Sequence, residues 1–119
     1  MSPIYDHAGS LHRMGNDEQL FQEMVGFLRD DAPARLRDIQ AGVDAANWQR
    51  ARHAVHSLKG LVSNFGAQRA MMGAIKLENL LQQRPESAEV KGAYEELSAA
   101  VNELQRALMP HSHSSGSPA

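Results

Sequence analysis

Apolar residues recur along this chain at alternating steps of three and four, the spacing of positions on one face of an α-helix. The clearest row lies in a stretch that begins near residue 48 and ends near residues 64–66. Its members are Trp48, Ala51, Val55, Leu58 and Val62. A longer row runs from residue 20 to residue 43 and comprises Leu20, Met24, Phe27, Leu28, Ala32, Leu36, Ile39 and Val43. We expect both rows to face a common core of packed helices.

Two further segments carry the same pattern. The row in residues 67–83 consists of Ala70, Met71, Ala74, Leu77 and Leu81. The row in residues 87–109 consists of Val90, Tyr94, Leu97, Val101, Leu104 and Leu108. Asn47 is suited to cap the helix that follows it, Gly66 to end that helix, and Pro85 to stop the next. The sequence therefore predicts an all-α protein, an up-and-down four-helix bundle, with no strand pattern that competes.

Pro33 interrupts the longest row. A proline removes one helical hydrogen bond and crowds the preceding turn, so it kinks a helix or splits it. Because the row keeps its phase across Pro33, we expect one continuous, kinked helix, capped by Asn16 or Asp17.

The ends of the chain differ from the bundle in composition. Residues 1–9 are mostly polar and are expected to form a flexible arm, and residues 110–119, PHSHSSGSPA, a disordered tail. Residues 10–109 are expected to form one bundle domain, including a short extra N-terminal helix through Leu11 and Met14.

Composition narrows the functional classes. The chain has 119 residues, a formal net charge of −2 from 12 basic and 14 acidic residues, and no cysteine. The balanced charge argues against nucleic-acid binding and against contact with an anionic membrane. The missing cysteine excludes disulfides and cysteine-type zinc sites. Because no long apolar run or signal-peptide core is present, we expect a cytoplasmic domain, either free or part of a membrane-bound protein.

Candidate chemistry lies beside the row of residues 48–62. His56 is on a flank of that helix, with Arg52 one turn before it, Lys59 and Gly60 one turn after it, and Ser63 two turns after it. A solvated imidazole offers an unprotonated ring nitrogen as a nucleophile, and an ammonium one turn away can face an anion carried on that ring. A glycine costs about 1 kcal/mol in a helix interior, and close approach of another surface would explain it.

The run His56-Ser57-Leu58-Lys59-Gly60, with Gly66 six residues after Gly60, resembles the signature of histidine phosphotransfer (HPt) domains. That signature reads His, any residue, Leu or Ile, Lys, Gly, with a second Gly six residues on. The leader LHRMGNDEQLFQEMVGFLRDDAPARL and the later Leu77-Glu78 also resemble the family, so the likeness covers residues 5 to 108.

The resemblance implies a phosphorelay carrier of the kind found at the C-terminus of hybrid sensor kinases. A receiver domain would give the phosphoryl group of its aspartyl phosphate to Nε2 of His56, and a second receiver's aspartate would then take it. Lys59 would hold the phosphoryl oxygens, and Gly60 would leave room for the receiver. The domain would be no enzyme and would need no nucleotide, cofactor or metal, because Mg²⁺ belongs to the receiver.

Other residues are assigned secondary roles from their positions. Arg52, Ser63 and Gln68 are candidates for peripheral contacts with phosphate or receiver. The apolar residues Leu11, Met14 and Leu61 are candidates for a receiver docking patch. We expect receiver domains as partners, a hybrid kinase in the same chain as a further possibility, and a monomer.

Rival interpretations stay open. The phosphoacceptor domain of a chemotaxis-type kinase shares the motif but takes its phosphate from a kinase domain that uses ATP. A helical adaptor would bind partners without phosphoryl chemistry. In the dimerisation domain of an ordinary sensor kinase an acid follows the His and a proline comes about five residues after it. Ser57 and Leu61 stand at those positions here and disfavour this class.

Two chemical alternatives are disfavoured by spacing. His53 lies three residues before His56, but no Cys or Glu stands at an offset that would complete a metal site. Glu78 is expected to make a surface or helix-pairing contact, because no second carboxylate is positioned for acid catalysis with it.

Overall fold

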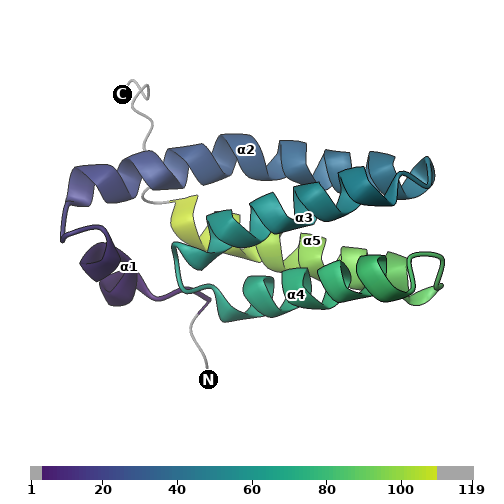
Figure 1. The fold of residues 1–119 in the computed structure, drawn as a ribbon. Helices are drawn as coiled ribbons and strands as arrows, with labels where there is room; N and C mark the ends of the chain where they lie inside the picture. The colour runs from purple at the N-terminus through teal and green to yellow at the C-terminus, as the bar shows by residue number, and fades with distance from the viewer. Residues whose placement is uncertain (1–3, 110–119) are drawn as a thin grey trace.

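Four long helices and one short helix make up the protein. The structure, a computed structural model, describes residues 4–109. The helices are α1 (His7–Arg13), α2 (Glu18–Asp44), α3 (Trp48–Ser63), α4 (Gln68–Gln83) and α5 (Glu89–Leu108). Helices α2 to α5 run up and down side by side, α5 returns to α2, and α1 lies across one end of the bundle (Figure 1). The predicted all-α bundle with an extra N-terminal helix is confirmed.

The core lies between the four long helices and is built from the predicted apolar rows of α3, α4 and α5. Leu58, Leu77 and Leu97 are fully buried at its centre. At the α1 end the rings of Phe21 and Phe65 meet edge to face, with their centroids 5.8 Å apart. Burying each of these large side chains stabilises the fold by about 1.5–3 kcal/mol, and this burial fixes which face of each helix remains outside.

The apolar row predicted for the first half of α2 is wrong at Leu20 and Phe27 but right at Leu28, and Met24 is partly buried against the core. Phe21, Val25 and Leu28 are buried there, whereas Leu20 is 37% exposed and Phe27 56% exposed. The sequence has apolar residues at both of two adjacent rows, so spacing alone does not decide which row faces the core. Beyond Leu28 the two rows merge, and the predicted positions from Ala32 to Ile39 are buried.

Helix α2 is continuous through Pro33, as the phase of its row predicted. Asp17 is its N-cap, and the Asp17 side chain accepts a hydrogen bond from the backbone N–H of Leu20 at 3.1 Å. Asn47 caps α3 in the same way, through the N–H of Arg50 at 3.1 Å. The capping side chains predicted from the sequence thus set where α2 and α3 begin.

The short helix begins earlier than predicted. Asp6 caps α1 by accepting a hydrogen bond from the Gly9 N–H at 2.9 Å, so residues 7–9, which were assigned to a flexible arm, are helical. The backbone N–H of Asp6 also donates to the Phe65 carbonyl oxygen at 2.8 Å. The neighbouring Gly66 has a φ of +59°, and a Cβ there would lie 3.0 Å from Cβ of Asp6. Residues 1–3 and the predicted tail, 110–119, lie outside the described residues.

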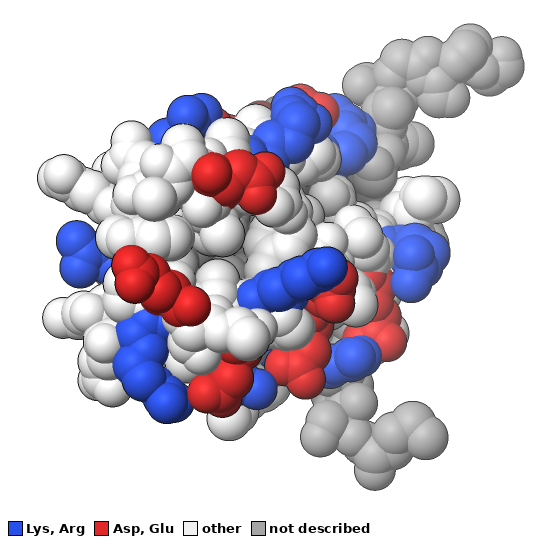
Figure 2. All heavy atoms as spheres, turned by 90° about the vertical axis from the view of Figure 1, so that its right-hand side faces the viewer, with Lys and Arg blue, Asp and Glu red and all other residues white. Residues whose placement is uncertain are grey.

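Charged side chains of both signs share the surface. Figure 2 shows basic and acidic side chains interspersed at the end of the bundle that carries the α2–α3 and α4–α5 turns. Between α4 and α5 three ion pairs follow one another along the seam, Arg69–Glu103, Lys76–Glu96 and Arg84–Glu89. Within residues 4–109, no helix has the length and apolar character needed to span a membrane.

Candidate functional site

His56 projects from α3 into solvent. Its neighbours Val55 and Leu58 are buried in the core, and this orientation of α3 leaves 69% of the His56 side chain exposed. Lys59, one turn further along α3, is 28% exposed and lies toward α4. The histidine and the lysine that the sequence placed on one flank therefore do lie together, at the seam between α3 and α4.

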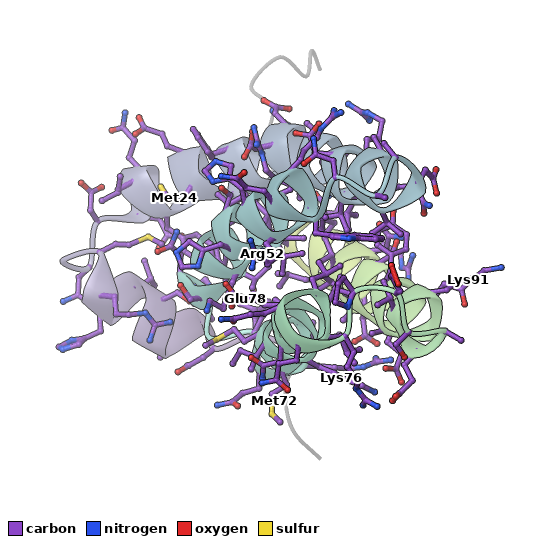
Figure 3. The ribbon with its side chains drawn as sticks, turned by 45° about the vertical axis from the view of Figure 1, so that its right-hand side comes forward. Met24, Arg52, Met72, Lys76, Glu78 and Lys91 are labelled. Atoms are coloured by element: carbon purple, nitrogen blue, oxygen red, sulfur yellow. The ribbon has the colours of Figure 1, made fainter. Side chains whose placement is uncertain are left out.

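Glu78 of α4 connects the two residues. Its Oε1 accepts a hydrogen bond from Nζ of Lys59 at 2.8 Å, and its Oε2 lies 3.2 Å from Nδ1 of His56. Figure 3 shows Glu78 between α3 and α4. Sequence reasoning gave Glu78 only a surface or helix-pairing contact and missed that the helix contact is with His56. The signals in the sequence were its place beside the core residue Leu77 and the resemblance of Leu77-Glu78 to the family.

The charge of Glu78 determines which nitrogen of the His56 ring carries the proton. The hydrogen bond from Lys59 lowers the pKa of Glu78, and the bond with His56 adds to the effect, while burial opposes both. Glu78 is therefore ionised at neutral pH, and an ionised carboxylate only accepts hydrogen bonds. Nδ1 of His56 must be the donor. The neutral ring then carries its lone pair on Nε2, the nitrogen that points away from Glu78.

Gly60 leaves open space beside the histidine. A Cβ built at Gly60 would have no atom within 4 Å, so nothing in the packing of residues 4–109 requires a glycine there. Gly66, the second glycine of the motif, is different, because its positive φ and the nearby Asp6 both exclude a side chain. The two glycines of the motif thus differ in role. Gly66 allows the left-handed backbone of the turn, and Gly60 leaves no side chain beside His56.

The peripheral candidates differ in burial and in bonding. Arg52 is half-buried one turn before His56, and Gln68 is exposed as the first residue of α4. The Ser63 hydroxyl donates to the Gly60 carbonyl oxygen at 2.8 Å. Leu11, Met14 and Leu61 are half-buried and pack against the core, which leaves only part of each available to a partner.

The described residues contain no cluster of side chains suited to bind a metal ion. Among residues 4–109, no group of three or more His, Asp or Glu side chains is placed to hold a metal ion together. The arrangement is instead a nucleophile, an oriented proton and a cation at an exposed helix seam. It suits the transfer of an anionic group onto a ring nitrogen.

The bundle thus presents the exposed His56 beside Lys59 and Glu78 at the seam between α3 and α4. The family model of the Hpt domain matches residues 23–107, and the chain belongs to this family. It therefore has a histidine phosphotransfer role in a phosphorelay. Proteins of this family carry phosphoryl groups rather than act as kinases, and they pair with receiver domains.

A solved structure supports the fold. The crystal structure of histidine-containing phosphotransfer protein B from Pseudomonas aeruginosa PAO1 is similar to this one, with a TM-score of 0.83. The match covers 94% of this chain and 96% of that chain at 22% sequence identity. At that identity the likeness concerns the fold. Among curated proteins, none matches the sequence at a significant level.

Proposed function

We propose that His56 is the phosphoacceptor and that Nε2 is the atom that is phosphorylated. A receiver domain's aspartyl phosphate is the donor, and the aspartate of a second receiver is the acceptor. The observation that carries the proposal is the contact between Glu78 and Nδ1, because it leaves the lone pair on the exposed nitrogen. The motif and the family membership point to the same residue.

The transfer is a single in-line displacement in each direction. The Nε2 lone pair attacks phosphorus, the P–N bond forms as the P–O bond breaks, and the aspartate leaves as a carboxylate with the bonding electrons. The ring keeps the proton on Nδ1 and becomes cationic, and the Glu78 carboxylate, 3.2 Å from Nδ1, balances this charge. Attack by the second receiver's carboxylate on phosphorus restores the neutral ring.

Lys59 and Gly60 support this step from the same helix. The ammonium of Lys59 has three N–H donors, and Glu78 takes one of them in a 2.8 Å bond. The remaining donors can face phosphoryl oxygens carried on His56, with Arg52, Ser63 and Gln68 as more distant contacts. The open space at Gly60 admits the receiver surface that surrounds the donor aspartate.

The domain is proposed to use no cofactor of its own. Mg²⁺, which neutralises phosphoryl charge during transfer, is held by the receiver. We further propose that the domain acts in the cytoplasm as a monomer, alone or as part of a hybrid sensor kinase.

A docking surface for the receiver is proposed on α2 beside α3. Leu20 and Phe27 are exposed there with the half-buried Met24 between them, at helical spacing on one side of α2. An apolar row of this kind provides the desolvated centre that a specific interface needs. The half-buried Leu11, Met14 and Leu61 can contribute their exposed portions.

Phosphoryl transfer from a panel of phosphorylated receiver domains tests the proposal. The wild type and His56→Gln are incubated with each receiver and separated on a gel that preserves acid-labile phosphoramidates. We expect acid-labile label on the wild type and none on the variant. Label only from a kinase with ATP would assign the domain to the chemotaxis-type class, and label from neither source would favour a helical adaptor.

A further inference from the structure

The lysine and arginine side chains of α3 are not balanced by any acidic residue on the same helix. Helix α3 contains Arg50, Arg52 and Lys59 and neither aspartate nor glutamate. Arg50 pairs with Asp38 of α2 at 3.0 Å, and Lys59 pairs with Glu78 of α4 at 2.8 Å. Arg52 is half-buried and forms no hydrogen bond or ion pair with any of the described residues. Its charge is therefore uncompensated within the described part of the chain.

The neighbouring helix offers Arg52 no carboxylate. Because α3 and α4 are antiparallel, the position one turn before His56 on α3 corresponds to the position one turn after Glu78 on α4 (Figure 1). That position is Gln82, which is exposed and uncharged. The two oxygens of Glu78 are already engaged, one by Lys59 and the other by His56. Figure 3 labels Arg52 on α3 together with Glu78 at the α3–α4 seam.

Any protein that reaches His56 must also cover Arg52. Residues four apart on a helix share a face, and their Cβ atoms lie about 5–6 Å apart. A standard interface buries about 800 Å² on each partner, which corresponds to a footprint about 16 Å in radius. A receiver that brings its donor aspartate to Nε2 therefore removes water from Arg52 as well. A charge that loses water without gaining an opposite charge weakens binding, so the receiver has to supply an anion at this point.

That anion is a carboxylate of the receiver rather than the transferred phosphoryl group. Side chains on an α-helix incline toward its N-terminus. Lys59, which follows His56, therefore leans toward the ring, whereas Arg52, which precedes it, leans away from the ring. The phosphoryl oxygens fall to Lys59, and the guanidinium of Arg52 is left to the surrounding surface. Its planar fork of N–H donors matches a carboxylate in a bidentate pair.

We infer that Arg52 pairs with a carboxylate on the receiver beside its donor aspartate and thereby selects receivers that carry one there. The inference rests on the proposed function, because it takes a receiver as the molecule that meets His56. A receiver with a neutral or basic residue at that point leaves Arg52 unpaired in the interface and docks poorly. The contact favours encounter and docking, and the displacement at phosphorus does not depend on it.

The salt dependence of phosphoryl transfer tests the inference, with a receiver that labels the wild type as donor. Arg52→Gln removes the charge and Arg52→Glu reverses it. Arg37→Gln and Arg37→Glu are the matched controls, because Arg37 of α2 is exposed and also forms no ion pair with a described residue. At about 0.05 M salt we expect kcat/KM to fall about fivefold in Arg52→Gln with kcat unchanged, to fall further in Arg52→Glu, and to stay near the wild-type value in both controls. At about 1 M salt, where charges are screened beyond about 3 Å, Arg52→Gln should approach the wild type.

A charge-swap experiment identifies the carboxylate on the receiver. Aspartates and glutamates around the donor aspartate are changed to lysine one at a time, and each receiver variant is combined with Arg52→Glu. We expect one of these receiver variants to transfer poorly to the wild type and to recover transfer to Arg52→Glu. Recovery with none of them would contradict a direct ion pair.

The contrary results can be told apart. No receiver label on the wild type would overturn both the proposed function and the inference. Transfer to Arg52→Gln at the wild-type rate would overturn the inference alone. A loss that persists at high salt would show that Arg52 acts through packing, and an equal loss in labelling by phosphoramidate, a small donor that needs no docking, would assign Arg52 to the phosphoryl group. If circular dichroism shows that a variant unfolds, Arg52→Met, which keeps an aliphatic stem without the charge, carries the same comparison.

Discussion

Two seams of the bundle carry ion pairs of the same chemistry in different arrangements. At the α3–α4 seam one carboxylate, Glu78, is 24% exposed and is shared by Lys59 at 2.8 Å and His56 at 3.2 Å. At the α4–α5 seam each carboxylate has one cationic partner among the described residues, and these carboxylates, Glu103, Glu96 and Glu89, are 35%, 67% and 57% exposed.

The ion pairs at the α4–α5 seam align two helices, whereas the one at the α3–α4 seam also orients a histidine ring. Exposed single pairs contribute about 0–1 kcal/mol each, and their regular spacing matches the antiparallel register of α4 and α5. The sheltered carboxylate at the α3–α4 seam has a lowered pKa and dictates which nitrogen of a neighbouring ring bears the proton. Glu78 differs from the carboxylates of the α4–α5 seam because it is shared between a lysine and a histidine ring.

Neutralising Glu78 should have the largest effect of any change outside His56 itself. Glu78→Gln no longer offers an ionised acceptor to Nδ1, so the ring populates the tautomer with its proton on Nε2. We expect transfer from a receiver to slow by about tenfold, or about 1.4 kcal/mol in the barrier. Glu103→Gln at the α4–α5 seam is the matched control. Equal transfer rates for Glu78→Gln and Glu103→Gln would contradict a special role for the carboxylate at the α3–α4 seam.

Filling the space at Gly60 should separate stability from function. Gly60→Ala and Gly92→Ala each add a methyl group at an exposed helix position where a Cβ meets no atom within 4 Å. Each should stabilise the fold by about 0.5–1 kcal/mol. Only Gly60→Ala should slow transfer, by severalfold, because its methyl group stands where the receiver approaches. Thermal unfolding and transfer rates measure both effects, and an unimpaired Gly60→Ala would contradict the assigned role.

Acid should weaken the α3–α4 seam through Glu78. The folded-state pKa of Glu78 lies below its ordinary value of 4.5, so its contribution to stability is present above that pH. The contribution is lost as the pH falls through the lowered pKa. Denaturant unfolding should show the wild type more stable than Glu78→Gln at neutral pH, by less than about 1 kcal/mol, with the gap closing as the pH falls through the lowered pKa of Glu78. A gap that persists in acid would contradict the prediction.

The smallest effect is expected at the α4–α5 seam. Arg69→Gln removes an exposed pair with Glu103 and should change the free energy of unfolding by less than about 0.5 kcal/mol. Receiver transfer should not change. A loss of more than about 1.5 kcal/mol would show that the pair does more than align the helices.

The helices and the reactive flank were predictable because both depend on local spacing. The apolar rows define the four long helices, and the row of α3 alone places His56, Lys59 and Gly60 together outside the core. The predicted caps Asp17 and Asn47 needed only the residues next to each helix start.

The features that sequence reasoning missed depend on contacts between segments that are distant in the chain, which residue spacing does not reveal. Whether Glu78 reaches His56 depends on how far α4 slides along α3, which is set by packing of the whole core. In α2 the adjacent apolar pairs at positions 20–21 and 27–28 make two rows equally good, and only contact with the other helices selects one. The start of α1 depended on Asp6, whose backbone is held by the distant Phe65.

The protonation of His56 is the point on which the proposed chemistry stands. Long-range proton–nitrogen NMR of the protein with 15N-labelled histidine, with His56 assigned through His56→Gln, reports it before and after phosphorylation. We predict a proton on Nδ1 in the free protein and phosphorus on Nε2 in the phosphorylated one. A free protein with its proton on Nε2, or a phosphoryl group on Nδ1, would contradict the role given to Glu78.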